Sequence, residues 1–254
     1  AFAVGRNVLQ FELGVNFSDL SHKNLNFSYI KEMQLNYTIR YGLMMEKLEI
    51  ILNGTYNQNK SVNNLLSEKG SEIKTQFLNS QSLGAKYLIF DPYKNEKWHS
   101  LSLTSWKKNN SLRWVDLIPA VSVYAGVNYV PEDAYFYNDP FTEIKKTTSY
   151  ETNENTVSFK GSIITQNHFL KKWVLVNNFI FDRIGTENIT INNITTLTHN
   201  FNNPIWSSMI EHELIQNDIY ADNLVKAGLA YLFNKSYQFD LSLGTNFKDS
   251  PNNL

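Results

Sequence analysis

Charged side chains stand at alternate positions within the most apolar stretches of this chain. Arg40 lies between Ile39 and Tyr41, and Lys86 has a similar setting. Because successive side chains of a strand point to opposite faces, such charges share one face and the apolar residues share the other. The charged face predicts an enclosed polar interior, whose lumen-facing members are Glu12, Glu32, Arg40, Glu49, Lys86, Asp116, Lys160, Glu211, Glu213, Lys226 and Asp240.

Two kinds of chemistry are open to these lumen-facing charges. They could line a conduit and select which solute passes, or they could pair with one another and fill a narrow interior. Barrels of eight strands are filled by side chains, whereas those of 16 to 18 strands hold an aqueous channel, so the strand number decides between them. The number of strands predicted for this chain lies between those cases, so both interpretations stay open.

Catalytic and metal-binding patterns are weak in comparison. His212 stands between Glu211 and Glu213, where a phospholipase-like site beside a serine is conceivable, but no serine lies in a recognisable nucleophile setting. No spacing typical of metal ligands occurs, and the acidic loop from Asp133 to Asp139 is a poor calcium candidate. The sequence therefore predicts no catalytic residue, no metal and no cofactor.

The composition limits the class of protein. The chain has 254 residues and 42% hydrophobic content, with 23 basic and 24 acidic side chains. This balance argues against a nucleic-acid partner, which needs a basic surface. No run approaches the roughly 20 apolar residues of a spanning helix. A transmembrane β-barrel reconciles these facts because only half of each spanning strand is apolar.

Alternation predicts eleven strands in one all-β domain covering residues 1–254, an up-and-down antiparallel transmembrane barrel. The facing of residues 173–183 and 190–201 stays open because these stretches alternate poorly. The predicted strands are 7–17, 27–41, 47–57, 82–90, 115–130, 156–166, 173–183, 190–201, 205–216, 224–233 and 236–247.

The connections alternate between short and long, as bacterial outer-membrane barrels require. The short, periplasmic set is predicted at 42–46, 167–172, 202–204 and 234–236; the external set is 18–26, 58–81, 131–155, 184–189, 217–223 and 248 onward. Residues 91–114 are too long for a periplasmic turn. They form either an inserted element on the periplasmic side or a hidden strand at 101–106.

Single-chain bacterial barrels contain an even number of strands, so eleven is anomalous. We expect a barrel of about 12 strands whose closing strand follows Leu254, because an open edge in lipid would leave backbone groups unpaired. The first residues, Ala1 to Arg6, lack the basic and apolar regions of a signal peptide, which suggests a mature chain.

Aromatic residues gather near the predicted strand ends, as in the interfacial girdles of outer-membrane barrels. A soluble sandwich would instead need a second apolar surface, and the opposite faces are too polar for one. These aromatic residues are Phe17, Phe27, Tyr29, Tyr41, Tyr56, Tyr129, Trp173, Phe233, Tyr237 and Phe247.

Tryptophan and basic residues are concentrated in the insertion at 91–114. These types are common at interface hot spots, which suggests docking of another outer-membrane or periplasmic protein. The alternative is an anchor at the lipid headgroups. The residues concerned are Trp98, Trp106, Lys107, Lys108, Arg113 and Trp114.

Several short motifs resemble the family of outer-membrane barrels assigned to transport in the phenol meta-cleavage pathway. They lie at residues 11–17, 39–43, 48–50, 83–87, 118–122, 227–231 and 239–244. The resemblance covers the whole chain, and the asparagine-rich style resembles envelope proteins of Bacteroidota. It implies a bacterial outer-membrane location, with outer-membrane lipid and lipopolysaccharide as surroundings.

Two functions are expected from these observations. The first is a porin-like channel or transporter for a small solute. The second is a non-transporting structural or accessory subunit of a larger outer-membrane complex. A lipid-active enzyme using His212 is a remote third. The substrate is not indicated by any residue of the sequence.

Overall fold

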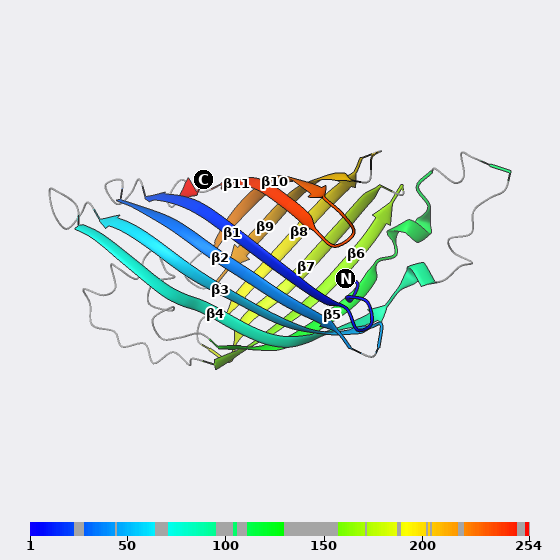
Figure 1. The fold of residues 1–254 in the computed structure, drawn as a ribbon, viewed down its shortest axis with the longest axis horizontal. Coiled ribbons are helices and arrows are strands. Elements are labelled where there is room, and N and C mark those ends of the chain that lie inside the picture. Colours follow the sequence, from blue (N-terminus) through cyan, green and yellow to red (C-terminus); the bar gives the residue numbers. More distant parts are fainter. Residues whose placement is uncertain are drawn as a thin grey trace.

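In a computed structural model the chain forms one antiparallel sheet that curls into a barrel wall (Figure 1). The structure describes residues 1–22, 28–43, 45–63, 71–94, 104–105, 111–129, 157–170, 172–186, 189–201, 203, 205–217, 221–247 and 252–253. Consecutive strands pair with each other from β1 to β11, and β12 pairs with β1. The predicted all-β, up-and-down fold is confirmed.

The strands are long and most begin within a few residues of the predicted positions. Their bounds are β1 Leu9–His22, β2 Ser28–Gly42, β3 Leu48–Asn63, β4 Ser71–Phe90, β5 Ala120–Tyr129, β6 Val157–Phe169, β7 Trp173–Ile184, β8 Thr190–Asn200, β9 Trp206–Gln216, β10 Ala221–Leu232, β11 Gln238–Asn246 and β12 Asn252–Asn253. Two short 3-10 helices, η2 Pro92–Lys94 and η3 Trp114–Leu117, lie between β4 and β5.

The two faces of the sheet differ as the alternation predicts. Apolar side chains on the outer face are exposed, with Leu13 at 63% and Leu241 at 73%. Polar side chains on the inner face are buried, and Ser122 and Ser158 are at most 1% exposed. The burial is inverted relative to a soluble domain, and a wall with this inversion suits a surrounding lipid phase.

The short connections lie at one end of the sheet and contain residues suited to tight turns. In the β10–β11 hairpin the Asn234 Oδ1 accepts hydrogen bonds from the backbone nitrogens of Ser236 and Tyr237, at 2.8 and 2.9 Å. Asparagine side chains commonly stabilise turns in this way. Between β6 and β7, Leu170 takes a positive φ of 49°. Because these turns are short, they help to set the register of each hairpin.

At the end opposite the short turns, β3 and β4 extend further than the alternation predicts. β3 continues to Asn63 and β4 already begins at Ser71, although residues 58–81 are predicted as a loop. In sequence these extensions are mainly polar, with few apolar residues such as Ile73 and Phe77, so the two-residue period is weak there. The backbone pairing nevertheless continues in register from Asn57 and Phe77 to Asn63 and Ser71.

The predicted strand at 115–130 is wrong at its start. Residues Trp114–Leu117 form η3, and β5 begins only at Ala120. The turn is stabilised by Asp116, whose carboxylate accepts hydrogen bonds from the backbone nitrogen and the guanidinium of Arg113, at 3.0 and 3.2 Å. Pro119 precedes the strand, so it requires no bulge within the ladder.

The register settles the facing of β7 and β8. In β7, Asp182 points inward to Lys160 while Phe179 and Phe181 are exposed. A bulge follows Phe181, where Arg183 has a positive φ of 57°. In β8, Thr196 donates a hydrogen bond to Glu211 at 2.9 Å and Ile191 is exposed. The bulge reverses the side-chain parity at the end of β7. Along the rest of the strand the alternation is weak because Val174, Val176 and Ile180 have the same parity as the inward Asp182.

A two-residue strand, β12, pairs with β1 just before Leu254, and the closing strand expected after Leu254 stays a prediction. Asn253 pairs with Leu20 and Asn252 with Ser21. In the part of the chain that the structure describes, β11 pairs with β10 on one edge only. Within the same ranges, no helix is long and apolar enough to cross a membrane.

We expect the outer face to tolerate charge much less than the inner face. Leu13→Arg should lower the free energy of unfolding from lipid vesicles by about 2 to 4 kcal/mol, because the guanidinium would enter the hydrocarbon region. Asn16→Arg on the inner face of the same strand is the control and should change it far less. Urea titration of both variants measures this difference, and equal losses would contradict the assigned faces.

Candidate functional site

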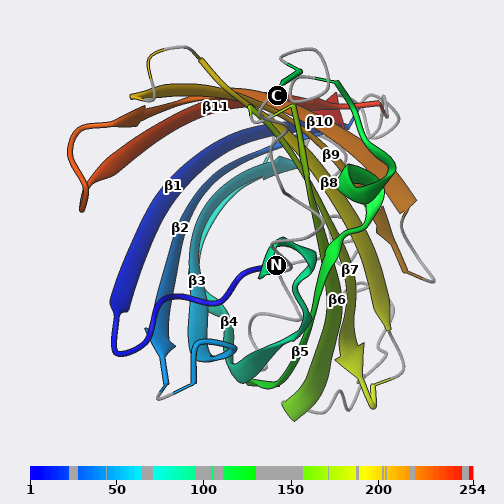
Figure 2. The ribbon, with the colours of Figure 1, turned by 90° about the vertical axis from the view of Figure 1, so that its right-hand side faces the viewer.

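The segment before β1 enters the barrel and crosses its inner face. Figure 2, a view along the wall, shows the N-terminus inside the curl of the strands. Asn7 and Val8 hold the segment to the end of β2 by backbone hydrogen bonds with Gly42, at 2.9 and 3.0 Å. Residues 1–6 are thereby placed opposite the inner side chains of β3 to β6.

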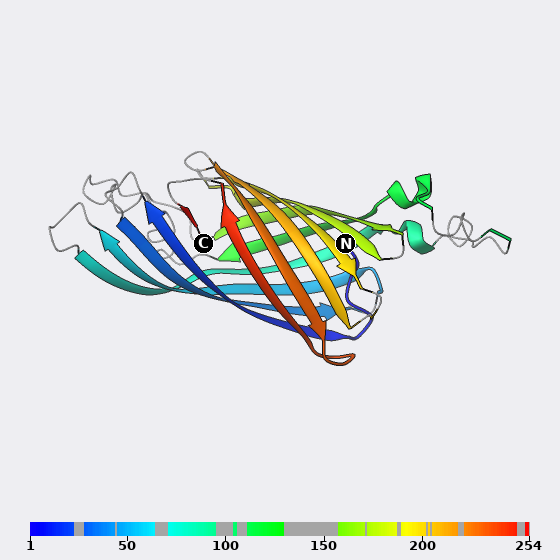
Figure 3. The same cartoon turned by 90° about the horizontal axis from the view of Figure 1, so that it is seen from above.

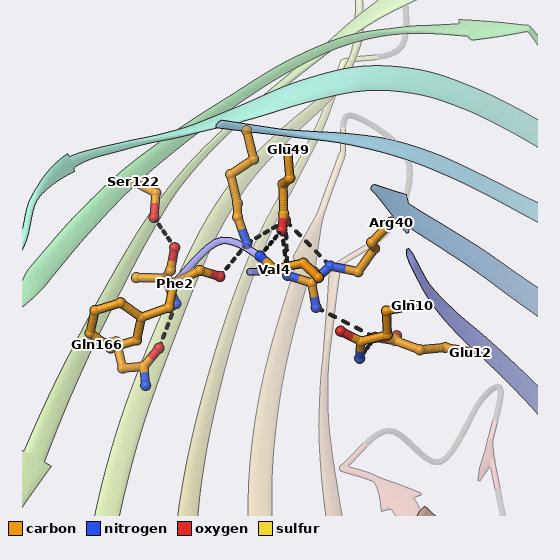
Figure 4. A network of polar contacts seen from close by, with 10 residues as sticks. Phe2, Val4, Gln10, Glu12, Arg40, Glu49, Ser122 and Gln166 are labelled. Carbon is orange, nitrogen blue, oxygen red and sulfur yellow. Dashed lines mark hydrogen bonds and ion pairs between the residues drawn. The ribbon is translucent and has the colours of Figure 1, made fainter. Parts of the chain in front are cut away.

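Glu49 on β3 is the centre of the contacts between this segment and the wall (Figure 4). Its side chain is fully buried and forms ion pairs with Lys86 Nζ at 2.6 Å and Arg40 Nη2 at 2.8 Å. The backbone nitrogen of Val4 donates a third contact, at 2.6 Å to Oε2. Arg40 also reaches Glu12 at 3.4 Å. Four of the predicted lumen residues thus form one network, the Glu49 network (Glu12, Arg40, Glu49 and Lys86).

The N-terminal segment is held along its length by inner-face donors. Lys86 Nζ donates to the Phe2 carbonyl at 2.9 Å, and the Ser122 hydroxyl donates to the Ala1 carbonyl. The fit against β2 is close at Gly42, where an added Cβ would lie 2.7 Å from the Val4 carbonyl oxygen and still nearer to that of Gly5. Only glycine permits this approach.

Aromatic side chains close the same end of the interior. Phe2 lies 6.0 Å from the ring of Tyr93 and 5.9 Å from that of His168, and the latter two rings meet edge to face at 4.7 Å. The His168 backbone nitrogen donates to the Tyr93 hydroxyl at 2.7 Å. Burial raises the pKa of Tyr93 further above neutral.

Two further ion-pair groups lie on the inner face away from the N-terminal segment. Lys226 on β10 contacts Glu213 at 3.0 Å and Glu211 at 3.2 Å on β9. Lys160 on β6 contacts Asp182 on β7 at 2.9 Å. Each predicted basic residue of the lumen therefore has a carboxylate partner, so these charges are arranged in pairs rather than in one stripe.

The remaining predicted lumen residues are dispersed. Glu32 accepts a hydrogen bond from Asn57 across β2 and β3. Asp240 on β11 is exposed and contacts Gln238 at 2.8 Å. Asp116 belongs to η3 at the barrel end, so its assignment to a spanning strand is wrong. Whether the lumen set forms a solute path or an ion-pair plug stays a prediction.

The insertion at 91–114 is described only in part. Lys94 pairs with Glu46 of the β2–β3 turn at 3.0 Å, and Figure 3 shows the green 3-10 segments beyond the strand ends on the side of the N-terminus. Trp114 is 87% exposed, while Arg113 is paired with Asp116. Trp98, Trp106, Lys107, Lys108 and most of the alternative strand at 101–106 lie outside the described residues.

The weaker chemical candidates are placed as follows. His212 lies on the outer face of β9, where its Nε2 is 3.1 Å from the Asn223 Oδ1. The described residues contain no group of three His, Asp or Glu side chains able to hold a metal ion. The loop from Asp133 to Asp139 lies outside them.

Comparison with known proteins defines the family. The family described as "Putative MetA-pathway of phenol degradation" matches residues 1–254. The chain belongs to this family. The predicted resemblance to phenol-pathway barrels is confirmed, while the likeness to Bacteroidota proteins stays a prediction. No curated protein matches the chain.

The comparison with solved structures also gives matches. An outer-membrane channel from Pseudomonas putida F1 matches with 11% sequence identity and a TM-score of 0.46. The match covers 96% of this chain and 88% of that chain.

Several inner-face residues of this phenol-pathway family member are not predicted from the sequence. Asp182 lies in β7, whose alternation is weak, and Asp222, which accepts a hydrogen bond from Asn246 at 2.7 Å, falls in a predicted loop. The N-terminal segment has no periodicity, so only its contacts reveal its position. One available signal was Gly42, a glycine at the very end of an otherwise well-patterned strand.

We expect Glu49→Gln to destabilise the protein strongly. The change removes the buried charge that compensates Lys86 and Arg40, and breaking such a pair costs about 3 to 5 kcal/mol. Glu12→Gln is the matched control because its side chain is half exposed, where an ion pair contributes at most about 1 kcal/mol. Urea unfolding in detergent measures both, and similar losses would show that Glu49 is not the centre of the network.

Proposed function

We propose that this chain forms a channel in the bacterial outer membrane for passive passage of a small solute. It is one barrel domain with the 91–114 insertion on the periplasmic side. Membership of the phenol-degradation family supports phenol-related compounds as the solute class. The proposal involves no catalytic step, so the inner-face charges would guide and filter the solute rather than react with it.

The inverted burial of the wall is the observation that carries this proposal. Exposed Leu, Phe and Ile side chains on the outer face suit hydrocarbon, and the inner face offers carboxylates, amides and hydroxyls to water or solute. The inner face is richer in polar side chains than the outer face, and a polar lining is the physical requirement for moving a polar molecule between two aqueous compartments.

The N-terminal segment would be the narrowest part of the route. It occupies the inner space beside β3 to β6, and Phe2, Tyr93 and His168 reduce the opening further at the insertion end. Passage would then depend on this segment, because its contacts with Glu49, Lys86 and Ser122 attach it to one side of the wall.

A second candidate is a non-transporting subunit of an outer-membrane complex. The complete burial of Glu49 beneath the segment favours it, since a filled interior stabilises a wall without opening a path. Conductance separates the two candidates. Current steps from the purified protein in a planar lipid bilayer support the channel, and their absence at every voltage and salt concentration tested supports the filled barrel.

Displacing the N-terminal segment should widen the channel. Gly42→Ala places a methyl group against the Val4 and Gly5 carbonyls, so we expect a larger single-channel conductance, by about twofold or more. Gly14→Ala is the matched control, because an added Cβ at Gly14 meets no atom within 4 Å. Unchanged conductance in Gly42→Ala, with the segment shown by hydrogen exchange to be released, would contradict its role as the narrowest part.

A further inference from the structure

Four polar residues stand side by side on the outer wall, which is apolar on most other strands. They are Thr165 on β6, Asn177 on β7, Thr195 on β8 and His212 on β9, and we call them the outer polar row. Each is the direct register partner of the next. With strands about 4.8 Å apart, the row is roughly 14 Å wide.

The outward direction of the row follows from its neighbours on the same strands. Two residues away from row members lie Ile163, Phe179 and Ile210, which are 47%, 44% and 58% exposed. The adjacent positions, Thr196 and Glu211, bond to each other on the inner face. The row therefore shares the face that carries the apolar band.

The row lies near the middle of the strands rather than at the polar rims. Thr195 is the central residue of β8, and His212 is one residue from the centre of β9. Beyond the row, the register continues to Val121 on β5 and Val225 on β10. The polar stretch is thus bounded by apolar residues on both sides and does not belong to an interface with headgroups.

Hydrogen bonds within the row satisfy only part of its capacity. Thr195 donates to Asn177 Oδ1 at 2.9 Å, and the Asn177 Nδ2 is 3.5 Å from the Thr165 hydroxyl. The His212 Nε2 contacts the Asn223 side chain on the neighbouring strand. An amide or hydroxyl left without a partner in hydrocarbon costs several kcal/mol.

We propose that the outer polar row is the centre of an interface with a second copy of this chain. The row carries no carboxylate, ammonium or guanidinium group, so a charged partner has nothing to recognise. Each member has both a donor and an acceptor. The row is therefore complementary to itself after a rotation of 180°, as an isologous two-fold contact requires. Phe179 and Ile210 would supply apolar contacts beside it.

The lack of cysteine in the sequence allows a direct test in the full chain. Single variants Asn177→Cys, Thr195→Cys and His212→Cys are expressed in bacterial outer membranes and oxidised. We expect at least one to form a disulfide-linked homodimer, because residues near a two-fold axis approach their own copies within the 7 Å Cα limit. Leu83→Cys, exposed on the outer face of β4, is the control and should stay monomeric.

If the two-fold axis lies away from these three positions, the cysteines cannot form a disulfide, so a second measurement tests the dimer directly. The triple variant Thr165→Val, Asn177→Leu and Thr195→Val keeps the wall apolar and should fold. We expect it to raise the dimer dissociation constant in detergent about tenfold or more, measured by analytical ultracentrifugation, because several hydrogen bonds are lost.

Three results would overturn the proposal. These are a wild-type protein that is monomeric in lipid, a triple variant that dimerises as well as the wild type, and a cysteine that links mainly to a different membrane protein. The dimer proposal requires that the wall lies in a membrane, but it does not require that the protein conducts. A monomer that conducts would therefore refute only the dimer, and a dimer that does not conduct would refute only the channel.

Discussion

The pairing of every backbone group in a continuous antiparallel ladder is the constraint on which the rest of this structure depends. In a lipid phase no water replaces a lost backbone partner, so each strand must pair with its neighbours along the spanning length. The register then determines which side chains meet. Glu49 and Lys86 are direct partners on β3 and β4, and a slip of one residue would turn one of them outward. The buried ion pair is thus a consequence of the ladder.

The side chains of the sheet do not supply all the hydrogen-bond donors of the Glu49 carboxylate. One donor comes from the N-terminal segment, which is thereby linked to the wall. A fully buried carboxylate needs several donors, because desolvation otherwise outweighs its attraction to one lysine. Lys86 and Arg40 supply charge, and the Val4 nitrogen supplies a further donor from outside the sheet. The segment in turn depends on Lys86 for its Phe2 carbonyl. Wall and segment therefore stabilise each other at this end in one cooperative arrangement.

The order of the strands and the facing of their side chains are largely predictable from the sequence. Where one face is apolar, as from Leu9 to Phe17, the two-residue period assigns each side chain to one face. Prediction fails where the period carries no information. The sequence is mainly polar at the loop ends of β3 and β4, which hides the period. A local Asp116–Arg113 contact forms η3 in place of a strand start, and the bulge at Arg183 reverses the parity. Of the candidate site, the charges of the Glu49 network follow from alternation. Their partners in residues 1–8 do not, because those contacts lie about 45 residues or more apart in sequence.

β7 and β8, whose facing the sequence leaves open, are two of the four strands that carry the outer polar row. In β8, alternation between Ile191 and Leu197 is interrupted by Asn193 and Thr195 on the outer side, while Asn192 and Thr196 occupy the inner side. A strand with lipid on one face and water on the other is expected to be polar on the water side only. Polar residues on both faces are expected where the outer face contacts protein, since hydrogen bonds across an interface compensate the desolvation of amides and hydroxyls. Ambiguous alternation within an otherwise regular wall thus indicates where the surroundings of that wall change.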